Sequence, residues 1–307
     1  MTSALTLRYT TQMRLDIERM TREMSDLQAQ VASGQRAQDL QGFAGKSNQV
    51  VNAQGLLALS EARASAATQL SARFGVQADA LANAARAGVD LSTAIRSALS
   101  ADDGRTLDID LSVAFSSVVT SLNETWNGQP LFAGERVGVR PVPLGSIDDL
   151  VALPSGQWFD ESERHQVVDL GAGAPVPLAD KASEIGAGLL TAMRDLKVVI
   201  DAAGGRLSDD LTPTQRTQLE QIADALVAAA NVVTASEGRT GQLARRIDDE
   251  RDRLTTRANL LSRELAEETA ADIPRISIEL STLEAQYQAT AKIFSDLSEL
   301  TLLNFLR

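Results

Sequence analysis

The sequence of 307 residues contains no cysteine and only one histidine, His165. Without thiols the chain cannot form a disulfide, bind a metal through thiolates or use a cysteine nucleophile. His165 lies in the stretch "DESERHQVV", with neither a nucleophile nor an acidic partner at a motif spacing. We therefore expect it to be a solvated loop side chain and not a general base.

Motifs for nucleotide binding are missing as well. There is no G-x-x-x-x-G-K-[ST] loop and no G-x-G-x-x-G turn after a strand. Adjacent carboxylates do occur, but a chain with 41 acidic residues contains such pairs by composition, and neighbours on a helix do not share a face. We therefore predict no enzymatic activity, no cofactor and no metal site at Asp102/Asp103, Asp148/Asp149, Asp209/Asp210 or Asp248/Asp249.

Basic charge and long apolar runs are also scarce. The formal net charge of -12 argues against a nucleic-acid partner, which usually requires a clustered basic surface. No stretch approaches the ~20 apolar residues of a membrane span. The first residues lack a basic segment followed by an apolar run, so they do not form a cleavable signal peptide. We expect a protein that is either cytoplasmic or exported by a route that needs no cleaved signal.

Proline and aromatic residues are few and unevenly placed. Six of the eight prolines and both tryptophans fall between Trp126 and Lys181, and the flanking arms are rich in good helix formers. This distribution predicts a mainly α fold, a long helical bundle or coiled coil made by the two arms, with a small turn-rich insert of short strands in the middle.

Apolar spacing gives the expected helices. The alternation from Leu107 to Phe115 also fits a strand, but Leu111, Phe115 and Val118 continue at helical spacing, so we favour a helix. Asp272 is a candidate cap for a last helix with Pro274 in its first turn. The other helices are expected over residues 7–32, 47–99, 103–123, 182–203 and 212–268, the last with "SEGRTG" (residues 236–241) as a candidate break.

Each arm carries one apolar stripe with a heptad rhythm. The stripes consist of Met13, Ile17, Met20, Met24, Leu27 and Val31 in the first arm, and of Ile276, Leu280, Leu283, Tyr287, Thr290, Phe294 and Leu297 in the last. We call them the terminal seams. One alternative is that they only pair with each other within a monomer. The end of the chain adds more apolar residues than one partner helix covers, so we predict that the seams also serve assembly, together with Leu302, Leu303, Phe305 and Leu306.

The stretch "WNGQPLFAGER" marks the start of the insert. Asn127 and Gly128 favour a turn, and Pro130 prevents the preceding helix from resuming. We predict that Trp126, Leu131 and Phe132 anchor the insert against the helices, and we expect no chemistry there.

Four stretches together resemble the flagellin superfamily of bacterial flagellar axial proteins. They are "IERMTREMSDLQAQVASGQRAQDL" from Ile17, "NGQPLFAG" from Asn127, "EGRTGQLARRIDDERDRL" from Glu237 and "AQYQATAKIFSDLSELTLLNFL" from Ala285. The "LFAG" turn is most similar to the hook-filament junction branch, the hook-associated protein 3 family. Two joints depart from the family pattern: "SGQRAQDLQGFAGKSN" lacks a "DDPA"-like part, and "DIPRISIELS" replaces an Ala-rich helical start.

The resemblance implies a structural subunit of the flagellum, outside the cell and exported without a cleaved signal peptide. Its partners would be hook-associated protein 1, flagellin, further copies in a ring or helical layer, and the flagellar export apparatus with or without an export chaperone. It further implies an inner domain (1–46 with 270–307), a helical middle domain (47–126 with 181–269) and an outer insert (127–180). A filament flagellin and, from another class, a cytoplasmic coiled-coil adaptor remain as alternatives.

Overall fold

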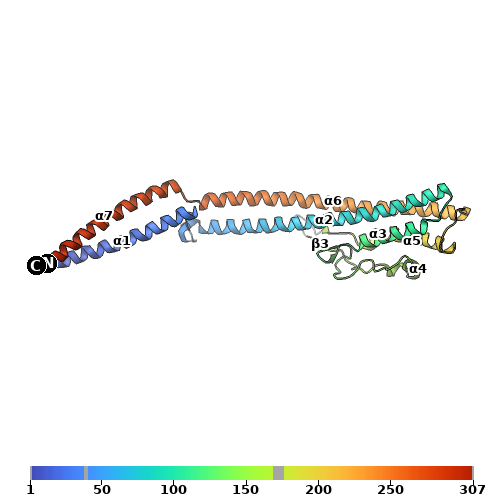
Figure 1. Cartoon of the computed structure of the whole chain (residues 1–307), viewed down its shortest axis with the longest axis horizontal. Helices are drawn as coiled ribbons and strands as arrows, with labels where there is room; N and C mark the ends of the chain where they lie inside the picture. The colour runs from blue at the N-terminus through green and yellow to red at the C-terminus, as the bar shows by residue number, and fades with distance from the viewer. Residues whose placement is uncertain (1, 38–40, 169–175, 306–307) are drawn as a thin grey trace. The chain divides into compact units, whose positions relative to one another are not determined.

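A computed structural model describes residues 2–37, 41–168 and 176–305, and side chains over 11–37, 43, 45–168 and 176–296. The described chain is mainly α-helical, so the predicted fold class is confirmed (Figure 1). Its α-helices are α1 (Thr2–Ser33), α2 (Ser47–Ala101), α3 (Leu107–Leu122), α4 (Asp149–Ala152), α5 (Ala182–Ala202), α6 (Pro213–Thr269) and α7 (Ile273–Phe305). Two short 3-10 helices lie at Gln41–Lys46 and Ser155–Gln157.

The helix boundaries follow local capping signals. Before α6, the Thr212 hydroxyl accepts a hydrogen bond from the backbone N–H of Gln215 at 3.3 Å, and the Gln215 side-chain oxygen accepts one from the backbone N–H of Thr212 at 2.9 Å. Pro213 occupies the first helical position, where a missing N–H costs nothing. Before α7, the Asp272 carboxylate accepts a bond from the N–H of Arg275 at 3.2 Å, as predicted for a cap.

Helix α6 is continuous through residues 236–241, so the candidate break in "SEGRTG" is wrong. Two polar residues of this stretch, Ser236 and Thr240, are buried and find partners on other elements instead of opening the helix. The Ser236 hydroxyl donates to Asp180 at 2.5 Å, and the Thr240 hydroxyl accepts from the Gln77 amide at 3.0 Å. The two glycines cost about 1 kcal/mol each in a helix, and these tertiary contacts outweigh that cost.

The chain divides into two compact units. One contains residues 1–62 with 254–307, and the other contains residues 63–253. Helices α2 and α6 contribute to both units. The three-domain division implied by the resemblance stays a prediction.

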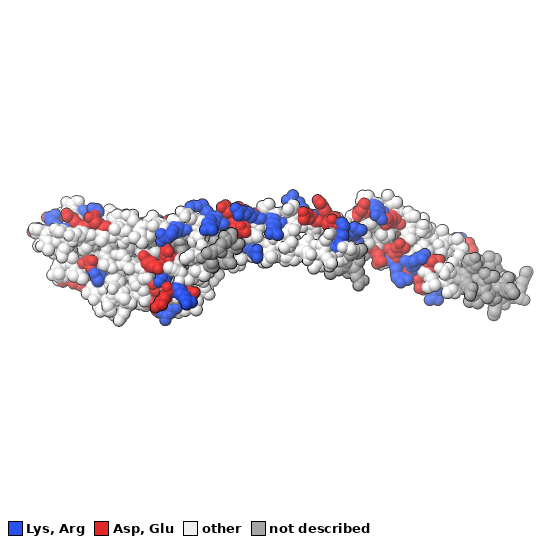
Figure 2. All heavy atoms as spheres, turned by 180° about the vertical axis from the view of Figure 1, so that it is seen from behind, with Lys and Arg blue, Asp and Glu red and all other residues white. Residues whose placement is uncertain are grey.

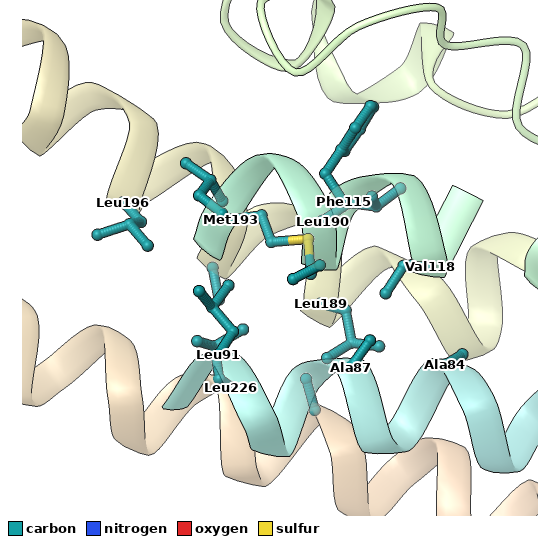
Figure 3. Close-up of a cluster of buried hydrophobic side chains, with 14 of the residues drawn as sticks. Ala84, Ala87, Leu91, Phe115, Val118, Leu189, Leu190, Met193, Leu196 and Leu226 are labelled. Atoms are coloured by element: carbon teal, nitrogen blue, oxygen red, sulfur yellow. The ribbon is translucent and has the colours of Figure 1, made fainter. Parts of the chain in front are cut away.

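The unit of residues 63–253 has a core built by α2, α3, α5 and α6. Figure 3 shows side chains of all four helices meeting there, with Leu91 from α2, Phe115 from α3, Met193 from α5 and Leu226 from α6. The helices approach closely because Gly88 lacks a side chain: a Cβ there would lie 2.5 Å from a methyl of Leu189. The strand alternative for the segment after Leu107 is therefore wrong, since α3 buries its helical stripe in this core.

The insert folds against this core and contains little sheet. Strands β1 (Thr125–Trp126) and β2 (Gln129–Pro130) form one antiparallel pair, and β3 (Val167–Val168) and β4 (Val176–Pro177) form another. In the first pair, Pro130 has no backbone N–H with which to continue the ladder. Most of the insert is irregular chain that packs through buried residues including Leu144, Leu150 and Trp158. Pro175 lies outside the described residues.

Candidate assembly interface

Helices α1 and α7 pack along each other as an antiparallel pair within the unit of residues 1–62 and 254–307 (Figure 1). The terminal seams supply the inner side of this pair. Met20 and Ile276 are buried. The remaining described seam residues are half-buried, except Val31, which is exposed: Met13, Ile17, Met24 and Leu27 on α1, and Leu280, Leu283, Tyr287, Thr290 and Phe294 on α7. A single chain therefore covers its own seams only in part.

Further apolar side chains of the pair face away from the seams. Leu15 on α1 and Ile293 on α7 are exposed, and Ile278 on α7 is 69% exposed. Leu297, Leu302, Leu303 and Phe305 lie on α7 beyond the described side chains, and Leu306 lies outside the described residues. The described part of the pair thus presents single apolar side chains to solvent outside the seams.

The two long helical arms are interrupted at the same level. The N–H of Arg36 donates to the carbonyl of Thr269 at 2.8 Å, and the N–H of Ala271 donates to the carbonyl of Gly34 at 3.0 Å. Gly34 has a φ of +66°, a left-handed conformation that glycine adopts without strain. These are the two joints at which the sequence departs from the flagellin pattern. The structure ties them together by backbone hydrogen bonds, which do not depend on side-chain identity.

The insert joint is a β-hairpin. Trp126 pairs with Gln129 across Asn127 and Gly128, whose φ angles of 50° and 76° fit a type I′ turn. Trp126 is half-buried, and Pro130, Leu131 and Phe132 are buried. The carbonyl of Phe132 accepts a hydrogen bond from the N–H of Ala182, the first residue of α5, at 2.9 Å. The sequence singled out these residues, but it placed only a turn where the structure has a hairpin.

Neither a family model nor a curated protein matches the sequence. Solved structures match its fold, among them two flagellar proteins. The first is a flagellar hook-associated protein from Vibrio parahaemolyticus, with 12% sequence identity, a TM-score of 0.59 and coverage of 73% of this chain and 97% of that one. The second is FlgL from Bacillus cereus, with 11% identity, a TM-score of 0.53 and coverage of 71% and 99%. The chain has the fold of these flagellar proteins.

Within this fold, the anchoring role of Trp158 was not apparent from the sequence. Its ring is buried, its indole N–H donates to the carbonyl of Leu153 at 3.2 Å, and the guanidinium of Arg194 lies 5.8 Å from the ring centroid. The apolar residues around Trp158 follow neither a helical nor a strand spacing, so the sequence does not indicate whether its ring is buried. Its partner Arg194 comes from α5, distant in the sequence.

Most of the adjacent carboxylates accept hydrogen bonds in a turn or form ion pairs. Asp149 accepts hydrogen bonds from the backbone N–H groups of Ser146 and Gly145. These bonds, with the larger effect from Ser146, hold the pKa of its carboxyl below the usual value. Other members pair with cations: Asp102 with Arg216, Asp103 and Asp209 with Arg105, Asp148 with Lys197, and Asp248 with Arg251. Among the described residues, no cluster of three or more histidines and carboxylates is arranged to hold a metal ion.

His165 does have an acidic partner, so the expectation of a solvated side chain is wrong. Its Nε2 lies 3.0 Å from both carboxylate oxygens of Glu184, and the side chain is half-buried. The same carboxylate accepts the backbone N–H of Lys181 at the start of α5. Because Glu184 lies 19 residues away, sequence spacing gave no sign of the pair. The contact attaches the insert to α5.

The surface carries both signs of charge. Figure 2 shows basic and acidic side chains interspersed on the face drawn, with no extended basic area. None of the helices, over the residues described, is apolar and long enough to cross a membrane.

Proposed function

We propose that the chain is a structural, non-enzymatic subunit of the bacterial flagellum that forms the junction layer between the hook and the filament. The observation that carries this proposal is the fold itself. A chain that pairs its first and last helices and loops everything else out between them matches most of a flagellar hook-associated protein and of FlgL.

The mechanism we propose is burial of the terminal seams between subunits. The half-buried residues of α1 and α7 retain apolar surface that neighbouring helices would cover. Burial of a further ~40 Å² at each seam position would contribute about 1 kcal/mol at ~25 cal/mol per Å². About ten such positions would together contribute about 10 kcal/mol. The ordering cost of association is roughly 4–15 kcal/mol, so seam burial exceeds this cost only when the cost lies in the lower part of that range. Assembly would therefore also need contacts outside the seams.

The resemblance of the sequence supports the finer assignment. The "LFAG" turn at Leu131 favours a junction protein over a filament flagellin. Its neighbours would then be hook-associated protein 1 and flagellin, and it would reach them through the flagellar export apparatus without a cleaved signal. The domain division and the seam residues given above belong to the same proposal.

Immuno-electron microscopy of isolated flagella tests the location. We expect one band of label at the boundary between hook and filament. Label along the whole filament would assign the chain as a flagellin, and label confined to the cytoplasm would support the coiled-coil adaptor instead.

A variant pair tests the mechanism. The variant Leu283→Asp places a charge in the seam of α7. The control variant Ile278→Asp places the same charge on an exposed position of α7 outside the seam. We expect Leu283→Asp, and deletion of the last ten residues, to leave the unit of residues 63–253 folded and to abolish incorporation into flagella. Normal filament growth with the truncated chain would refute seam-driven assembly.

A further inference from the structure

Three leucines of α2 and α6 are exposed to solvent. Leu56 and Leu59 of α2 are 41% and 47% exposed, and Leu260 of α6 is 53% exposed. All three belong to the unit of residues 1–62 and 254–307. We call them the leucine patch.

The spacing from a neighbouring groove places Leu56 and Leu260 on one side of the α2–α6 pair. Gln49 of α2 and Glu267 of α6 line one groove of about 370 Å³. Leu56 lies seven residues after Gln49, and Leu260 lies seven residues before Glu267. Because residues one heptad apart occupy the same side of a coiled-coil helix, Leu56 and Leu260 lie on the side of the α2–α6 pair that carries the groove.

Charges flank the leucine patch in a fixed order. Arg257 precedes Leu260 by three residues and Glu264 follows it by four, so all three lie on one side of α6. Both charged side chains are exposed, and neither forms an ion pair with another described residue. The patch therefore has a basic end and an acidic end.

A second apolar surface lies in the unit of residues 63–253. Ile109 and Val113 of α3 are 57% and 62% exposed and line a groove of about 590 Å³. Asp110 lies at one end of this surface. At the other end, Arg86 of α2 lines a neighbouring groove with Ser117 of α3. Within the described chain neither Asp110 nor Arg86 forms an ion pair, so this patch has an acidic end and a basic end.

We infer that the leucine patch of one copy docks on the Ile109–Val113 patch of a second copy. Arg257 would then meet the partner's Asp110, and Glu264 would meet the partner's Arg86. The two charged ends are about equally far apart on both patches. Arg257 and Glu264 are seven residues apart on α6, which is ~10.5 Å of helix. Asp110 and Ser117, the neighbour of Arg86, are also seven residues apart on α3. The pairing covers both apolar patches of every copy.

The consequence is a directional, repeating contact. Two different surfaces joined head to tail form a ring or a helical array, whereas a contact between identical patches stops at a dimer. This inference rests on the proposed function in one respect: it names surfaces, besides the terminal seams, that join copies within the layer.

Cysteine cross-linking tests the contact cleanly because the chain has no cysteine of its own. Full-length Leu260→Cys and Val113→Cys proteins are oxidised mildly, separately and mixed. We expect a disulfide-linked dimer only in the mixture, several-fold above the yield with Ile278→Cys in place of Leu260→Cys. Cross-linking of Leu260→Cys with itself would indicate a two-fold contact and overturn the inference, as would a mixture no better than the control.

Charge reversal separates a direct contact from a change in folding. Arg257→Glu in the Leu260→Cys copy should lower the cross-link yield several-fold, and Asp110→Arg in the Val113→Cys copy should restore it. The same pairs of variants are also produced together in cells, and the flagella isolated from those cells are oxidised. Label at the hook-filament boundary without the cross-link would refute the inference alone. The cross-link with purified protein, without flagellar label, would refute the proposed function alone.

Discussion

Replacing Phe132 by alanine should loosen the insert from the helical core of residues 63–253. Phe132 is 1% exposed and belongs to the main hydrophobic cluster. Its carbonyl also accepts the N–H of Ala182 at the start of α5. The substitution leaves that backbone bond possible but removes the ring that holds the two segments together.

The expected loss follows from the burial. Truncating a fully buried phenylalanine costs about 3–5 kcal/mol, from lost burial and from the cavity left behind. With a urea dependence of about 2–3 kcal/mol per M for a unit of this size, the unfolding midpoint should fall by roughly 1–2 M. The exposed Val137 of the same insert, at 66%, provides the control, and Val137→Ala should shift the midpoint by less than ~0.2 M.

Two probes locate the effect. Trp126 and Trp158, the only tryptophans, both lie in or beside the insert, so fluorescence follows that region while far-ultraviolet circular dichroism follows the helices. We expect the fluorescence midpoint of Phe132→Ala to fall by the amount above. An unchanged midpoint, or one no lower than that of Val137→Ala, would refute the assignment of Phe132 as the anchor.

Two further substitutions test polar groups. Thr240→Val removes the acceptor of the buried Gln77 amide, whose carbonyl oxygen already lacks a hydrogen-bond partner among the described residues, and should cost about 1–3 kcal/mol in urea unfolding. Adding Gln77→Leu should recover most of that loss, and a double variant as unstable as the single one would contradict this account. The Arg105 side chain and then its backbone N–H lower the pKa of Asp103 to about 2. Because this folded-state pKa lies below the usual 3.8, the contribution of Asp103 to stability is present above pH ~4 and is lost as the pH falls towards 2. The difference in midpoint between wild type and Asp103→Asn should shrink over that window, and a carboxyl titrating near 4 in an NMR titration would refute it.

Helices were predictable because their signals are local and repeated. Asp272 caps α7 through the N–H of Arg275, as predicted, and Thr212, at the expected start of α6, caps that helix through the N–H of Gln215. The long apolar stripes left little doubt about the remaining helices. For the α3 segment, the apolar spacing beyond Phe115 decided between a helix and a strand, and the helix is correct.

The errors arose where tertiary contacts decide the outcome. The polar Ser236 and Thr240 indicated a break, yet partners on other segments satisfy them inside a continuous helix. His165 was read as solvated because Glu184 comes near only after the insert has folded back on α5. The likeness of the fold to hook-associated proteins confirms the resemblance at the level of the fold. The seams as an assembly interface stay a prediction, since they concern contacts between chains.

The buried polar pair of Gln77 and Thr240 also explains how two long helices find one register. A heptad stripe is compatible with a slip of seven residues, because apolar positions still face apolar positions. Such a slip of α6 would bring Val233 or Ile247, both buried and apolar, to the level of Gln77 and leave the amide and the hydroxyl without each other. Unsatisfied buried groups cost about 1–3 kcal/mol each, so the native register is favoured over its neighbours by several kcal/mol. The polar pair therefore contributes little to total stability but selects one alignment of α2 and α6 within the unit of residues 63–253.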